Sequence, residues 1–171
     1  MINPIPEFYV VQPGKLLAGN YPNASGEKET RAKLRHLLES RVTFFVDLTQ
    51  EGELEPYTPL LKEEARTLGI AVEHRRMPIP DFDVPTVAEM EEILDTIDTA
   101  SAAGYIVYVH CHFGLGRTGT VAGCYLVRYG IDGKQALEKL VSLRQGTRFQ
   151  GMSSPVTHQQ RQMVKDWPLG G

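Results

Sequence analysis

One stretch near the middle of the chain restricts its fold more than any other. Residues 105–109 (YIVYV) form a short, continuous apolar run, which is typical of a strand buried on both faces. The next ten residues, 110–119, contain three glycines, and a helix is expected to start at Arg117 or Thr118 and to run to Tyr129. The chain therefore places a buried strand, a tight glycine-rich loop and the first turn of a helix in immediate succession.

The rest of the chain alternates between strand and helix patterns. Residues 7–19 predict two short strands joined by a Pro-Gly turn, and further strands are expected at 42–48 and 70–77. Helices are expected at 27–40, at 59–69 with Gly69 as its end, at 86–101 behind a Thr86/Glu89 capping box, at 133–144 behind Asp132, and in a last helix with Pro155 in its first turn. This order predicts an α/β fold with a small mixed sheet flanked by helices, in one domain spanning 1–171.

Charge and composition narrow the classes of partner. The net charge of −3 gives no basic field for nucleic acid or an acidic membrane surface, and no apolar run approaches the roughly 18 residues of a membrane span. The first residues lack the pattern of a secretory signal, and two cysteines, Cys111 and Cys124, make no disulfide framework. We therefore expect a cytoplasmic monomer that binds neither nucleic acid nor membrane.

The glycine-rich loop has the chemistry of an anion site that contains a nucleophile. Unpaired N–H groups at a helix N-terminus attract anions, and Gly114, Gly116 and Gly119 let the backbone curl around one centre. The same field stabilises a thiolate at Cys111, and the guanidinium of Arg117 is the best bidentate partner for a phosphate. The loop is thus suited to hold a phosphate with a sulfur beneath it.

The sequence H-C-x-x-G-x-G-R-T-G that starts at His110 resembles the signature of the cysteine-dependent protein tyrosine and dual-specificity phosphatases. The resemblance implies the fold of that family, with a strand, a phosphate loop and a helix at the active site, and it implies a metal-independent enzyme without a cofactor. The phosphate-binding loop would consist of His112, Phe113, Gly114, Leu115, Gly116 and Arg117.

The resemblance also requires a general acid upstream of the cysteine. Residues 77–86 (MPIPDFDVPT) resemble the acid loop of the family, and Asp81 follows a proline and precedes an aromatic residue, as the acid does in relatives. Asp83 lies in the same loop, so spacing alone does not separate the two aspartates. An aspartate in a proline-rich loop is otherwise usually a turn residue.

By analogy with the family, Cys111 attacks phosphorus, Arg117 stabilises the phosphate oxygens, and Asp81 protonates the leaving oxygen and then activates water. Thr118 would donate a hydrogen bond to the departing sulfur, and His110 would orient the loop from behind. Residues 153–160 resemble the segment whose glutamine orients water in some relatives, and both Gln159 and Gln160 are candidates, with an exposed helix face as the alternative. The implied substrates are phosphorylated protein side chains: phosphotyrosine, and also phosphoserine or phosphothreonine.

Other functions fit the sequence less well. A pseudoenzyme that only binds phosphate would be expected to lack Cys111, Asp81 or Arg117. A non-protein phosphate ester is the main alternative substrate, although His112, Phe113 and Leu115 stand where relatives that act on phosphoinositides tend to carry lysines. A rhodanese-like sulfur transferase would need a shorter loop, and the low-molecular-weight phosphatases carry their acid downstream of the cysteine.

Two further parts of the chain have open interpretations. Cys124 could be a resolving thiol, but a packed core position is favoured. Residues 49–57 either line the pocket or form an exposed acidic loop.

Overall fold

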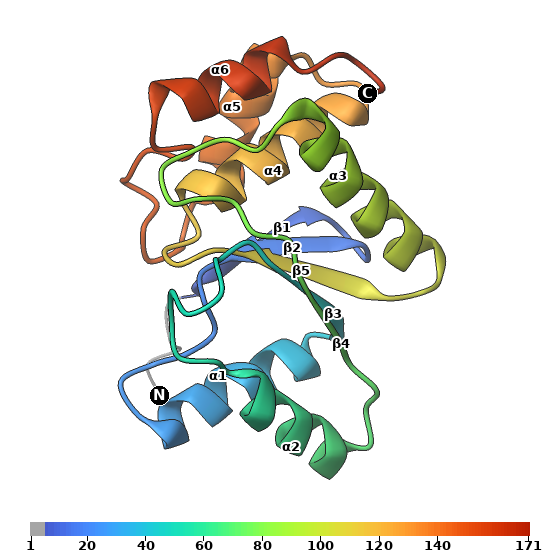
Figure 1. Cartoon of the computed structure of the whole chain (residues 1–171), viewed down its shortest axis with the longest axis vertical. Coiled ribbons are helices and arrows are strands. Elements are labelled where there is room, and N and C mark those ends of the chain that lie inside the picture. Colours follow the sequence, from blue (N-terminus) through green and yellow to red (C-terminus); the bar gives the residue numbers. More distant parts are fainter. Residues whose placement is uncertain (1–5) are drawn as a thin grey trace.

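The computed structural model describes residues 6–171, and its strands and helices follow the alternation that the sequence predicts (Figure 1). In chain order these elements are β1 (Phe8–Gln12), β2 (Leu16–Gly19), α1 (Glu27–Glu39), β3 (Val42–Asp47), α2 (Thr58–Leu68), β4 (Glu73–Arg76), α3 (Val87–Ala102), β5 (Ile106–His110), α4 (Gly116–Arg128), α5 (Gly133–Leu143) and α6 (His158–Asp166).

The strands form one five-stranded mixed sheet in the order β1-β2-β5-β3-β4. The β1 strand pairs antiparallel with β2, and the other neighbours are parallel. The β5 strand lies at the centre, and the last four of its five residues are buried, as expected for a strand covered on both faces. The predicted α/β fold with a small mixed sheet is confirmed.

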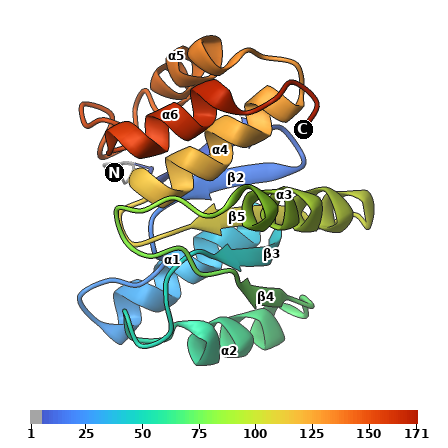
Figure 2. The ribbon, with the colours of Figure 1, turned by 45° about the horizontal axis from the view of Figure 1, so that its top comes forward.

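Helices cover both faces of the sheet, as Figures 1 and 2 show, with α1 and α2 on one side and α3, α4, α5 and α6 on the other. Each side has its own hydrophobic core. Leu34 and Leu38 of α1 pack with Phe45 and Tyr108 on one face, and Val109 packs with Val121 and Leu94 on the other. The α4 helix is buried from Arg117 to Val127, so the helix that follows the glycine-rich loop is also the centre of its layer.

Local signals explain most element boundaries. The capping box of Thr86 and Glu89 is present at the start of α3, Asp132 caps α5, and Gly69 ends α2 with a φ of 67°. Two predicted boundaries are wrong, that of β4 and the start of the last helix. The β4 strand covers only Glu73–Arg76 rather than 70–77, because it is a short edge strand that pairs with β3 alone.

The last helix begins at His158, three residues after Pro155. Thr157 and Gln160 form a capping box there, with the Thr157 side chain accepting from Gln160 N and the Gln160 side chain accepting from Thr157 N. This reciprocal cap satisfies two orphan donors, whereas Pro155 would have satisfied none. Residues 153–157 therefore form a bent, non-helical segment that precedes the helix.

The parallel strands end together at one edge of the sheet. Gly19 and Asp47 are both paired with His110, and Asp47 is also paired with Arg76. The loops after β2, β3, β4 and β5 therefore meet at this carboxyl edge, which is where α/β sheets bind ligands.

Candidate active site

The loop after β5 places Cys111 at the base of the carboxyl edge. Cys111 is 3% exposed, and the loop turns through Gly114 into α4, which begins at Gly116. Gly114 has a φ of 73°, and a side chain there would collide with the backbone of Gly19 and Asn20. The backbone after β2 therefore lies in direct contact with the loop. The hydrogen bond from Tyr21 N to His112 O, at 2.9 Å, stabilises this contact.

The other two glycines of the loop serve a different purpose from the one predicted. Gly116 and Gly119 lie in α4, and only Gly114 among the three has a positive φ. A side chain at Gly119 would collide with Ser154 Oγ, and one at Gly116 would lie 3.0 Å from Gln160 Oε1. These two glycines let α6 and the segment before it approach the first turn of α4, rather than let the loop curl.

Arg117 lies in that first turn, and its guanidinium is 1% exposed. Nη1 donates to Glu53 Oε2 at 2.9 Å and to Ile79 O at 3.0 Å, and Nη2 donates to Glu53 Oε1 at 2.6 Å. Its Nε is buried and has no partner within residues 6–171. Burial alone would lower the pKa of Arg117, but the hydrogen bonds to Glu53 raise it above the usual value.

Glu53 is the site residue that our sequence interpretation left undecided, as one of several acids in 49–57. Its carboxylate binds the Arg117 guanidinium in a bidentate pair, and this hydrogen bonding lowers the pKa of Glu53. Glu51 and Glu55 of the same loop are exposed. The only sequence signal was that the loop follows the strand predicted at 42–48.

Asp81 lies close to the same guanidinium, with Oδ1 at 3.2 Å from Arg117 Nη2. It belongs to a tight turn, Pro80–Asp83, that Asp83 N closes by donating to Pro80 O at 3.0 Å; we call residues 80–83 the acid turn. Asp81 Oδ1 also accepts from Phe82 N. Asp83 forms no ion pair in the described chain, and its carboxylate accepts from Val84 N, so the two aspartates differ in their relation to Arg117.

His110 lies behind the loop and is completely buried. Its Nε2 lies 2.6 Å from Tyr57 Oη, its Nδ1 lies 3.4 Å from Cys111 O, and burial lowers its pKa to about 4. Asp47 is buried nearby. Burial opposes its ionisation, but hydrogen bonds from His74 and Thr49 more than compensate, so its pKa lies well below the usual value.

Three other sequence candidates occupy distinct environments. Thr118 is buried, and its hydroxyl donates to Gly19 O at 3.4 Å. Gln159 is exposed, whereas Gln160 is completely buried next to the loop. Cys124 is packed in the core of the α3–α6 side, and burial raises the pKa of its thiol.

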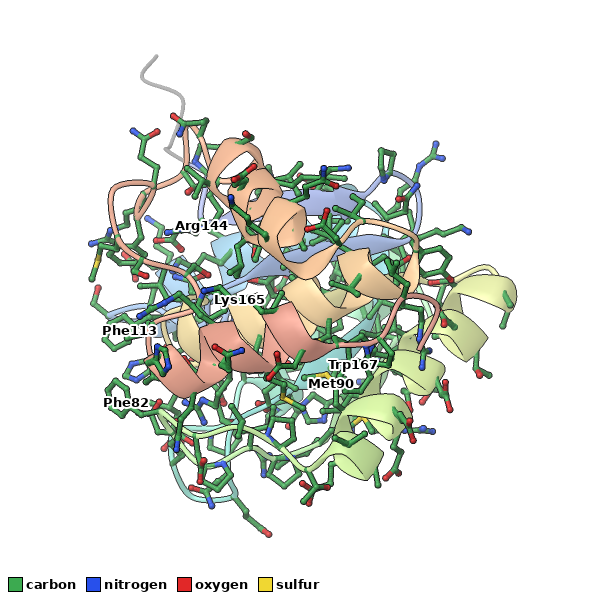
Figure 3. All side chains as sticks on the ribbon, turned by 90° about the horizontal axis from the view of Figure 1, so that it is seen from above. Phe82, Met90, Phe113, Arg144, Lys165 and Trp167 are labelled. Atoms are coloured by element: carbon green, nitrogen blue, oxygen red, sulfur yellow. The ribbon has the colours of Figure 1, made fainter. Side chains whose placement is uncertain are left out.

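Two aromatic side chains project from the mouth of the site. Phe82 of the acid turn is 64% exposed, and Phe113 of the loop is 57% exposed and stacks on His112 at 4.1 Å between ring centroids. Both lie on the same side of the molecule in Figure 3. These two rings therefore stand at the entrance to the site, on the loop that follows β5 and on the acid turn.

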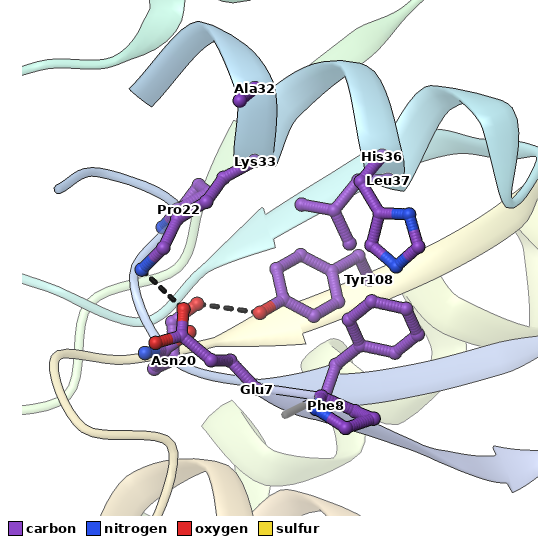
Figure 4. A pocket seen from close by; sticks show the side chains of 10 residues that line it. Glu7, Phe8, Asn20, Pro22, Ala32, Lys33, His36, Leu37 and Tyr108 are labelled. Carbon is purple, nitrogen blue, oxygen red and sulfur yellow. Dashed lines mark hydrogen bonds and ion pairs between the residues drawn. The ribbon is translucent and has the colours of Figure 1, made fainter. Parts of the chain in front are cut away.

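A separate pocket of about 270 Å³ lies between α1 and the sheet (Figure 4). Phe8, Leu37 and Tyr108 form its apolar part, and Lys33 pairs with Glu7 at its rim. Tyr108 Oη donates to Asn20 O at 2.6 Å, one residue beyond the Gly19 that contacts Gly114. This pocket therefore adjoins the back of the loop after β5 but contains none of the candidate catalytic side chains.

No helix among residues 6–171 is long and apolar enough to cross a membrane. No group of three or more His, Cys, Asp or Glu side chains in this part of the chain is arranged to hold a metal ion.

Comparison with solved structures identifies the fold. The solved structure described as Tk-PTP in the active form aligns over 95% of this chain and 96% of its own, with a TM-score of 0.72 and 25% identity. PTPMT1 in complex with PI(5)P aligns over 95% of this chain and 94% of its own, with a TM-score of 0.69 and 20% identity. The fold is therefore that of the protein tyrosine phosphatases.

Sequence comparison gives the family. A family model described as "Polymorphic toxin system, DSP-PTPase phosphatase" matches residues 21–131, and the chain belongs to this family of dual-specificity and tyrosine phosphatases. It is 29% identical over 155 residues to the Arabidopsis thaliana phosphatidylinositol 3,4,5-trisphosphate 3-phosphatase and protein-tyrosine-phosphatase PTEN1, covering 90% of this chain and 35% of that protein. It is 33% identical over 96 residues to cyclin-dependent kinase inhibitor 3 of Sus scrofa, covering 54% of this chain and 44% of that protein. The aligned region thus spans less than half of either relative.

Proposed function

We propose that this phosphatase hydrolyses phosphomonoesters of protein side chains, phosphotyrosine first among them, through a phosphocysteine intermediate. The observation that carries the proposal is the hydrogen bonding of the Arg117 guanidinium, in which one buried donor has no partner in the described chain. Its two Nη atoms are held by Glu53 and Ile79 O, while its buried Nε has no partner in the described chain. A buried donor without a partner is costly, and a phosphate oxygen above Cys111 would satisfy it.

The reaction has two steps. The Cys111 thiolate attacks phosphorus, a P–S bond forms as the P–O ester bond breaks, and Asp81 transfers its proton to the leaving oxygen. Water then attacks phosphorus, the P–S bond breaks, and Asp81 takes the proton from the water. The ion pair of Asp81 with Arg117 supports this assignment, since it places the carboxylate beside the group that binds the phosphate.

The composition of the mouth supports a protein substrate. Phe82 and Phe113 offer apolar rings to the residues around a phosphorylated side chain, and the exposed Glu51 and Glu55 of the loop after β3 disfavour a substrate with several phosphates. A lipid or inositol phosphate is the second candidate, because PTPMT1 was solved with PI(5)P and PTEN1 is named for a phosphoinositide activity. His112, Phe113 and Leu115 in place of lysines disfavour this alternative.

A kinetic panel tests the proposal. With phosphotyrosine and phosphothreonine peptides and a phosphoinositide as substrates, we expect kcat/KM to be highest for phosphotyrosine and lowest for the phosphoinositide. Activity should persist in EDTA, and vanadate should inhibit. The Cys111→Ser variant should bind phosphopeptide but show no turnover; substantial residual turnover in it, or a preference for the phosphoinositide, would contradict the proposal.

A further inference from the structure

We propose that Gln160 is a positioning residue that fastens the acid turn to the start of α6. The inference rests on the proposed function, because it assumes that Asp81 of this turn is the general acid. It assigns to the glutamine a role different from orienting water.

The side-chain amide of Gln160 forms three hydrogen bonds, all of them to backbone groups. Oε1 accepts from Val156 N and Thr157 N, both at 3.1 Å, and Nε2 donates to Asp83 O at 3.1 Å. The side chain is 0% exposed and lies against Gly116 at the start of α4. One amide thus joins the segment before α6 to the end of the acid turn, and it does so beside the first turn of α4.

The acid turn has little else to hold it at that end. Residues 80–83 are exposed, and they lie between the buried residues Ile79 and Pro85. Arg117 Nη1 holds the turn at its beginning through Ile79 O, at 3.0 Å, and Gln160 Nε2 holds it at its end through Asp83 O. Without the second anchor the turn keeps its internal Pro80–Asp83 bond but is free to tilt, and Asp81 moves with it.

The geometry also argues against a direct role in the reaction. Turning the amide toward a water molecule would break its bonds to two backbone N–H groups and a carbonyl, all of them part-buried, and this loss disfavours such a rotation. Gln160 therefore acts through Asp81. Its loss should weaken the steps that need the acid and leave the attack by Cys111 intact.

The test variant is Gln160→Glu. A glutamate at this position keeps the capping box and both bonds to Val156 and Thr157, but it cannot donate to Asp83 O. We expect kcat/KM to fall about 10-fold for a phosphate ester with a poor, alkyl leaving group, and less than about 2-fold for nitrophenyl phosphate. Gln160→Met, which carries no charge, should show the same dependence on the leaving group together with a lower melting temperature.

Thr157→Ala is the matched control. It removes the other half of the same capping box and destabilises α6, but it leaves the bond from Gln160 to Asp83 O in place. It should lower the melting temperature without changing the dependence of kcat/KM on the leaving group.

A double-mutant cycle distinguishes an action of Gln160 through Asp81 from an effect of Gln160 that is independent of Asp81. If Gln160 acts through Asp81, then Asp81→Asn combined with Gln160→Glu should be no slower than Asp81→Asn alone. Multiplicative losses in the double variant, or an equal loss with every leaving group in Gln160→Glu, would overturn this inference. Absence of a leaving-group dependence in Asp81→Asn itself would instead overturn the assignment of the acid, which belongs to the proposed function.

Discussion

At the scale of single residues, the guanidinium of Arg117 connects the loops that follow three different strands. It belongs to the first turn of α4, directly after the β5 loop, it binds Glu53 from the loop after β3, and it contacts Ile79 O and Asp81 from the loop after β4. Because a planar guanidinium has fixed donor directions, the Glu53 pair also decides where Nε points.

Replacing Glu53 by glutamine should therefore impair the enzyme with all substrates alike. A charge-assisted hydrogen bond contributes roughly 1.5–3 kcal/mol, so we expect kcat/KM to fall about 10- to 100-fold without dependence on the leaving group. Glu55→Gln, on the exposed part of the same loop, should retain activity within about 2-fold. Equal activities of the two variants would show that Glu53 does not orient Arg117.

The identity of the acid is also a question at this scale. General acid catalysis is typically worth about 10²–10⁴ in rate, and it matters most when the leaving group is poor. Asp81→Asn should lose activity steeply on phosphothreonine, less on phosphotyrosine and least on nitrophenyl phosphate. Asp83→Asn keeps the carbonyl that binds Gln160 and should show a small, uniform change. A graded loss in the Asp83 variant instead would move the acid by two residues.

At the scale of elements, the contact between the end of β2 and the phosphate loop depends on Gly114. Gly14, in the turn between β1 and β2, has the same φ of 73°, but a side chain there would meet nothing within 4 Å. The two positions therefore separate the cost of a positive φ from the cost of a collision.

Gly14→Ala should destabilise the fold by about 1–2 kcal/mol and leave activity unchanged. Gly114→Ala carries the same conformational cost and also displaces either the loop or β2, so activity should fall about 10²-fold or more, as expected for a misplaced catalytic group. Thermal unfolding and kcat/KM of both variants check this expectation. Similar activities would mean that the loop tolerates a shift of Gly19 and Asn20, which lie against Gly114.

The comparison of sequence with structure is clearest for these elements. The strand–loop–helix unit, the Thr86 capping box and the Gly69 end were predictable because their signals are local. The start of α6 was mispredicted because two caps competed, and Pro155 is the more conspicuous of the two in the sequence. The partners of Arg117 and Gln160 could not be read from the sequence, because they lie 64 and 77 residues away along the chain and depend on strand order.

At the scale of the whole molecule, the buried polar groups behind the phosphate loop make stability dependent on pH. The unfolded chain protonates a histidine near its ordinary pKa of 6.5, whereas burial in the fold lowers the pKa of His110 to about 4. The unfolded state therefore takes up the proton first, and stability falls as the pH drops from 6.5 to 4. Asp47, whose pKa is also lowered, extends this loss to still lower pH.

We expect the free energy of unfolding to decrease by about 3 kcal/mol from His110 alone over this range. Denaturant unfolding between pH 7 and pH 4 measures it. His110→Asn should flatten the dependence, and the exposed His158→Asn should retain it. An unchanged slope in His110→Asn would mean that other groups control the acid response.

The burial of Cys124 has a consequence for the fate of the molecule under oxidative stress. Cys124 lies eight residues after the start of α4, about 12 Å along the helix axis, and its side chain is 0% exposed. Because Cys124 is buried and burial raises the pKa of its thiol, it is a poor nucleophile toward a sulfenic acid formed on Cys111. Recovery of activity would then depend on small thiols from the surroundings. The length of exposure to peroxide would decide whether the loss of activity is reversible or permanent.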